Sequence, residues 1–108
     1  MTFTLSIKTA EDLAAAAAEQ AAAAVVAAID AHVEAVARSR GYNSAATLAG
    51  YATSTVPSWA AEAQAFVAWR DAVWTMVHAV QADVQAGNAP MPTPAEAVAA
   101  LPAIQWPA

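Results

Sequence analysis

The feature that most constrains this chain is a stretch of 31 residues, from Ala10 to Arg40, that contains neither glycine nor proline. Alanine, glutamate, glutamine and arginine dominate it, and these residue types have high helix propensities. Thr9 stands before the stretch as an N-cap, with Glu11 and Asp12 in the first turn, where the helix dipole favours acids. Gly41 follows as a residue suited to end a helix. We therefore expect one helix over residues 10–40, about 46 Å long at ~1.5 Å per residue.

The two halves of this helix differ in the side chains that they offer. Residues 14–24 provide only alanine around Glu19 and Gln20. The second half carries aliphatic residues at helical spacing, namely Val25, Val26, Ile29, Val33 and Val36. Because a compact domain of this length is roughly 34 Å across, two turns or more should extend beyond it. We therefore divide the chain into a partner-binding or oligomerisation arm, residues 1–24, and a small helical domain, residues 25–108.

A second long helix is expected over residues 58–86, opened by Pro57 and closed by Gly87. Its bulky residues fall within about a third of the helix circumference and should supply most of the core. They are Trp59, Phe66, Trp69, Val73, Met76, Val77, Val80 and Val84. Short helices are expected near residues 44–51 and after the capping box of Thr93 and Glu96, followed by a docked tail rich in Pro and Trp.

Residues 2–8 alternate bulky and polar side chains, with Phe3, Leu5 and Ile7 on one face. This alternation is typical of a strand, and it occurs nowhere else in the chain. A lone strand leaves its backbone groups unpaired, so we expect it to add to a sheet of a partner or of another copy. The expected fold is all-α: a long Ala-rich N-terminal helix packed on a second long helix plus short helices, with this lone N-terminal β-strand.

Composition removes several classes of function. The hydrophobic content is 59%, but alanine accounts for 35 of the 108 residues. Few large apolar side chains are therefore left to form a core. The chain lacks cysteine, and its net charge of -5 with few lysines and arginines argues against binding nucleic acid. We also expect no membrane span, because the longest stretch without charge, residues 41–61, is broken by polar residues and Pro57. A secretory signal is not expected either, because Lys8 is soon followed by Glu11 and Asp12.

Few side chains suit catalysis or metal binding. On a helix, Asp30, His32 and Glu34 point in different directions and should not converge on one ion. Asp71 and His78 share a helix face but lie two turns apart, about 10 Å, which is too far for a direct hydrogen bond. We therefore expect no catalytic residue, no metal and no cofactor, and a protein that is not an enzyme. A small hydrolase that uses Asp71 and His78 remains the enzymatic alternative.

The most distinctive cluster comprises Trp69, Arg70, Asp71 and Trp74. One interpretation is core packing with a cation–π contact between Arg70 and Trp74. The other is a binding hot spot, because Trp and Arg are enriched in such anchors. The candidate partner-binding residues are Phe3, Leu5, Ile7, Trp69, Arg70, Trp74 and Trp106.

Four motifs of the sequence carry a family resemblance. They are Tyr42-Asn-Ser, Tyr51-Ala-Thr-Ser-Thr-Val-Pro57, the block Glu62-Ala-Gln-Ala-Phe-Val-Ala-Trp-Arg-Asp-Ala-Val-Trp74, and the closing Leu101-Pro-Ala-Ile-Gln-Trp106-Pro. Together they resemble small tail-associated proteins of tailed bacteriophages and prophages. The resemblance covers about residues 25–108, and the block that ends at Trp74 is its specific part. It implies a tail-fibre assembly factor, or a minor component that stays attached to the fibre or tail tip.

This resemblance and the residue pattern lead to one leading hypothesis. We expect a non-enzymatic structural protein of the virion tail that binds a tail-fibre or tail-tip protein, in a homo- or hetero-oligomer. A transient tail-fibre assembly chaperone, located in the host cytoplasm during assembly and absent from the particle, is the alternative. A helical dimerisation module of a host bacterium is a further one.

Overall fold

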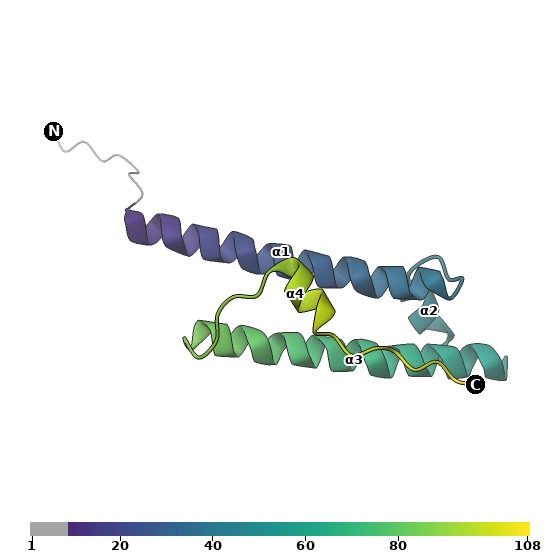
Figure 1. Ribbon diagram of the computed structural model, residues 1–108. Helices are drawn as coiled ribbons and strands as arrows, with labels where there is room; N and C mark the ends of the chain where they lie inside the picture. The colour runs from purple at the N-terminus through teal and green to yellow at the C-terminus, as the bar shows by residue number, and fades with distance from the viewer. Residues whose placement is uncertain (1–8) are drawn as a thin grey trace.

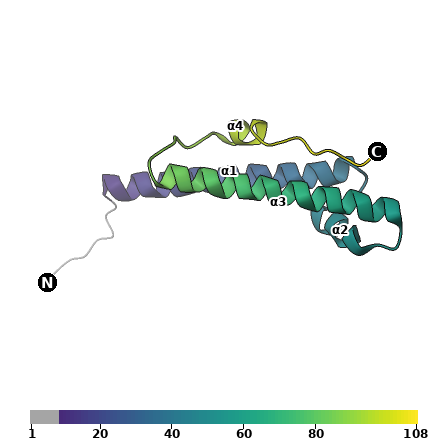
Figure 2. The same cartoon turned by 90° about the horizontal axis from the view of Figure 1, so that it is seen from below.

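The computed structural model describes residues 9–108, which form a small helical bundle. Its elements are α1 (Ala10–Ser39), α2 (Ala45–Ala49), the 3-10 helix η1 (Gly50–Thr53), α3 (Pro57–Gln85) and α4 (Pro94–Ala99). The long helices α1 and α3 run antiparallel beside each other (Figure 1). The short helices α2 and α4 lie on opposite sides of this pair (Figure 2).

The expectation of a mostly helical chain with a long N-terminal helix is confirmed. Residues 9–108 contain no strand. The strand expected over residues 2–8, with its candidate contacts Phe3, Leu5 and Ile7, lies outside the described residues.

Local capping fixes the ends of α1. The Thr9 hydroxyl accepts a hydrogen bond from the Asp12 backbone N–H at 3.1 Å, and the Asp12 carboxylate accepts one from the Thr9 N–H at 3.2 Å. This reciprocal pair satisfies donors that the first turn leaves free. At the other end Gly41 has a φ of 96°, and the Tyr42 N–H bonds back to the Ala37 carbonyl at 3.3 Å. The left-handed residue ends the helix, as the sequence predicts.

The other helices follow the same local rules. α3 begins with Pro57 at its first turn and is closed by Gly87, whose φ is 77°. α4 has the complete capping box of Thr93 and Glu96 that the sequence predicts. The ends of α1 and α3 therefore fall within one residue of the expected positions.

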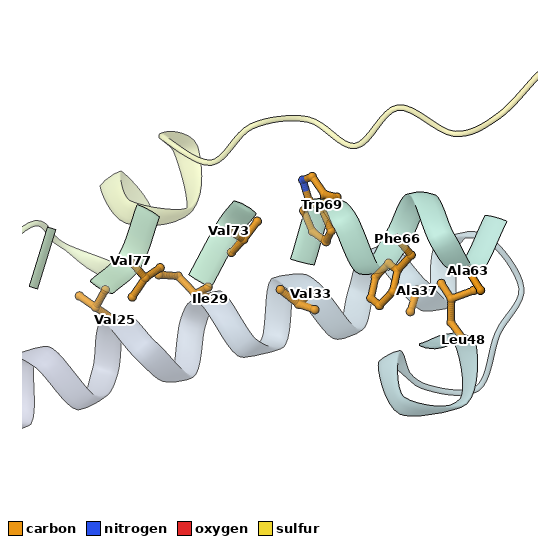
Figure 3. Close-up of a cluster of buried hydrophobic side chains, with 10 residues drawn as sticks. All are labelled: Val25, Ile29, Val33, Ala37, Leu48, Ala63, Phe66, Trp69, Val73 and Val77. Carbon is orange, nitrogen blue, oxygen red and sulfur yellow. The ribbon is translucent and has the colours of Figure 1, made fainter. Parts of the chain in front are cut away.

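The core lies between α1, α3 and α2 (Figure 3). Its buried residues are Val25, Ile29, Val33 and Ala37 of α1, Leu48 of α2, and Ala63, Phe66, Trp69, Val73 and Val77 of α3. Both long helices contribute side chains at i, i+3 or i+4 spacing, so each presents one stripe to the other. This core occupies the second half of α1 and the first two thirds of α3.

After α4 the chain runs as an extended tail along α3, and side chains hold it there. The indole Nε1 of Trp69 points toward the tail (Figure 3) and donates to the Pro102 carbonyl at 2.7 Å. Trp106 stacks on Phe66 with a ring separation of 6.5 Å. The Arg40 guanidinium lies 5.0 Å from the Trp106 ring and pairs with the carboxylate of Glu62. Arg40 therefore connects the end of α1, the start of α3 and the tail.

Candidate binding surface

The N-terminal half of α1 contributes almost no buried surface to the core. No residue from 10 to 24 is buried, whereas Val25, the first core residue of α1, is only 8% exposed. The N-terminal end of α1 extends past the C-terminal end of α3 in both views (Figures 1 and 2). Leu13, the one large apolar side chain of this half, is 57% exposed. Most of the exposed side chains in this half of α1 are alanine.

An apolar cleft of about 180 Å³ lies next to this exposed half, between α1, α3 and α4. Its apolar lining includes Ala22, Val25 and Ile29 of α1, Met76, Val77, Val80 and Val84 of α3, and Met91, Ala97 and Leu101 of the returning chain. The sequence placed Met76, Val80 and Val84 in the core, but these residues are only half-buried. They lie opposite the part of α1 that offers alanine, and alanine is too short to fill the space between the helices.

Two of the predicted contact tryptophans are used inside the fold. Trp69 is 7% exposed and packs beside Phe66, and its indole N–H is bonded to the tail. Trp106 is half-buried between Phe66 and Arg40. Core packing is therefore the role that the structure shows for Trp69, and attachment of the tail is the role that it shows for Trp106.

The other three residues of the Trp69 cluster, Arg70, Asp71 and Trp74, lie nearer the surface. Trp74 is half-buried and packs against the core. Arg70 donates to the Asp71 carboxylate at 3.1 Å, and the cation–π contact of the described residues joins Arg40 to Trp106 instead. The expected stacking of Arg70 on Trp74 is replaced because a neighbouring carboxylate offers a charge-assisted hydrogen bond.

Asp71 and His78, the pair considered for catalysis, lie apart on α3. Asp71 is paired with Arg70, and His78 is exposed two turns further along α3. No three acidic or histidine side chains of residues 9–108 come together in a way that could hold a metal ion. Burial raises the pKa of the Tyr42 hydroxyl, and the nearby Glu62 carboxylate raises it further.

One helix of the described region, α1, is long and apolar enough to cross a membrane, judged by length and composition alone. This helix carries several charged residues, so it lies outside the uncharged stretch at residues 41–61. The hydropathy of α1 comes mainly from alanine, and Glu19 lies within its first half. A charged residue near the centre of a span costs about 2.5–3.5 kcal/mol on insertion scales, which disfavours that location for this helix.

No protein-family model, curated protein or solved structure matches the chain. The function proposed below therefore depends on two observations: the exposed half of α1 with its adjoining cleft, and the sequence motifs between residues 42 and 107.

Proposed function

We propose that the chain is a non-enzymatic, tail-associated protein of a tailed bacteriophage or prophage. It binds a tail-fibre or tail-tip protein and remains in the virion as a minor structural component. The observation that carries the binding role is the unburied half of α1, residues 10–24. The block that ends at Trp74 and the tail around Trp106 supply the phage context through their resemblance to small tail proteins.

The exposed half of α1 is suited to packing against another helix. Axes of packed helices lie about 8–10 Å apart depending on the side chains between them, and alanine permits the shorter distance. An isolated helix of about 15 residues is only marginally stable in water. In this fold the capping box of Thr9 and Asp12 and the packed half beyond Val25 stabilise the exposed half. It is thus held in a helical form before a partner arrives, which lowers the entropy cost of binding.

Two acidic substitutions on this surface test the proposal. In a tagged full-length chain, Ala18→Glu with Ala21→Glu places two charges on exposed positions and retains good helix formers. The matched control is Ala68→Glu with Ala72→Glu, at exposed positions of α3 that do not line the cleft. Affinity capture from lysates of phage-producing cells, read by mass spectrometry, should recover a tail-fibre or tail-tip protein with the wild type and the control. Capture should fail with the α1 variant.

Two results would count against this proposal. Equal recovery of the tail protein with the α1 variant would remove the binding role of the exposed helix. Recovery of no tail protein with the wild type would remove the phage assignment. Mass spectrometry of purified virions then separates a structural component, which stays in the particle, from an assembly chaperone, which does not.

A further inference from the structure

The cleft beside the exposed half of α1 is apolar and already shaped. Val25, Ile29 and Val77 form buried parts of its wall, while Val80 and Val84 stand half-buried at its side. Glu96 is the charged residue of the lining, and its carboxylate caps α4 by accepting a hydrogen bond from the Thr93 N–H at 3.0 Å. With about 180 Å³, the space suits about one or two aliphatic side chains and no large polar group.

The charges of the molecule are unevenly placed around this cleft. Arg38, Arg40 and Arg70 are each paired with a carboxylate of the chain. Residues 9–37 and 71–108 contain no lysine or arginine. Several acids lie in the cleft lining or close to it in the chain. They are Glu96 in the lining, Glu19 one turn before Ala22, Asp83 directly before Val84 and Asp30 directly after Ile29.

We propose that the cleft and the adjoining alanine surface bind a basic amphipathic helix of a partner protein. Aliphatic side chains of that helix enter the cleft, and lysines or arginines on its flanks meet Glu19, Asp83 and Glu96. This inference rests on the proposed function, since it names the chemistry of the partner for the same surface. Opposite charges around an apolar contact add specificity and speed association.

The same charges argue against two other occupants. A second copy of the chain would bring acids against acids, and its described residues offer no unpaired arginine for this surface. Like charges placed together across an interface are unfavourable. An anionic membrane surface would be repelled for the same reason, which leaves a basic protein segment as the complementary occupant.

Synthetic helices of one design test the partner chemistry directly. The probe is a fluorescent 18-residue peptide with leucines at i, i+3 and i+4 spacing and lysines on its flanks. A second peptide carries glutamate in place of every lysine, and a third has the lysine peptide's composition in scrambled order. Anisotropy titrations with the full-length chain should give at least about tenfold tighter binding for the amphipathic lysine peptide than for either comparison peptide.

Variants of the chain then locate the binding. Ala22→Phe fills the cleft and should weaken binding at least about tenfold, since the leucine side chain that it displaces can no longer be buried there. Val84→Gln makes the cleft wall polar at a half-buried position, and it should also weaken binding. Circular dichroism verifies that each variant is folded, and Val84→Gln decides the question where Ala22→Phe disturbs the helix pair.

A matched pair of double variants tests the charges. Glu19→Gln with Asp83→Asn should weaken binding about threefold to tenfold at low salt, because two exposed ion pairs, each of modest strength, are lost. Glu34→Gln with Asp71→Asn changes the net charge equally at positions that are not next to a lining residue of the cleft, and it should have a smaller effect.

Three outcomes overturn the inference. They are equally tight binding of the glutamate peptide, binding that neither cleft variant changes, and self-association of the chain that the cleft variants abolish. The last outcome assigns the cleft to a second copy. Capture of a tail protein that depends on α1, combined with no preference for the lysine peptide, would leave the proposed function intact and refute only the basic character of the partner helix.

Discussion

Replacing Trp106 with alanine should detach the C-terminal tail and destabilise the whole bundle. The Trp106 ring stacks on Phe66 at 6.5 Å with an interplanar angle of 8°, and the Arg40 guanidinium lies 5.0 Å from it. The tail from Pro102 onward makes no backbone–backbone hydrogen bond within the described residues, so its position depends on such side-chain contacts. Trp106 is the largest of them.

The size of the loss follows from the buried ring. A half-buried tryptophan removes roughly 150 Å² from water, the lower end of the range for aromatic side chains. This is about 3.8 kcal/mol at ~25 cal/mol per Å² as an upper value. Compactness of the unfolded chain lowers this figure by roughly 10–40%. The stack and the cation–π contact add about 1–2 kcal/mol, and release of the tail returns some conformational entropy. We expect Trp106→Ala to lower the free energy of unfolding by about 2–4 kcal/mol.

Urea unfolding followed by far-UV circular dichroism measures this change without depending on tryptophan fluorescence. The matched control is Trp59→Ala, because Trp59 is 47% exposed and contacts Tyr51 only edge-on at 5.6 Å. Trp59→Ala should lower the free energy of unfolding by about 1 kcal/mol. A loss below about 1 kcal/mol for Trp106→Ala, or one no larger than that of the control, would refute the argument that the tail is part of the folded unit.

Three further substitutions test the local rules of the fold. Gly41→Ala should lower the free energy of unfolding in urea by about 1–2 kcal/mol, because Gly41 has a φ of 96°. Its control Gly50→Ala, at a φ of −63°, should be neutral or slightly stabilising. Equal effects of the two variants would contradict the left-handed cap. Ala37→Leu should cost about 1–3 kcal/mol by overpacking a site that is 0% exposed, and Ala35→Leu on the exposed face should change thermal stability little. The hydrogen bonds to Thr93 at the start of α4 lower the pKa of Glu96. The contribution of Glu96 to stability is therefore fully present above the ordinary carboxylate pKa and is lost as the pH falls through the lowered pKa. NMR of α4 should show this acid transition in the wild type and not in Glu96→Gln.

How far the sequence predicted the fold can be judged from particular residues. Thr9, Gly41 and Gly87 placed the helix ends within one residue, because a cap acts through hydrogen bonds and φ values of its immediate neighbours. The wheel of α3 also identified Phe66 and Val73 as core residues.

The candidate site was less predictable. The cleft was missed because the wheel assigned Met76, Val80 and Val84 to the core without regard to what α1 places opposite them. The sequence does contain both a stripe of bulky residues at the end of α3 and an alanine run at the start of α1. This combination was the one signal from which the cleft could have been predicted. The connection of Arg40 to Trp106 gave no signal, since 66 positions separate the two residues and the tail has no regular structure.

The sequence by itself determined where helices begin and end and which half of α1 is bare, because helix propensity, caps and side-chain size act within a few residues. Only the tertiary structure decided what the large side chains do. Trp69 became a core residue that bonds the tail, Trp106 became the anchor of that tail, and the last valines of α3 became the wall of a cleft. These roles depend on how α1 and α3 lie against each other and where α4 crosses them, and no local pattern specifies that geometry.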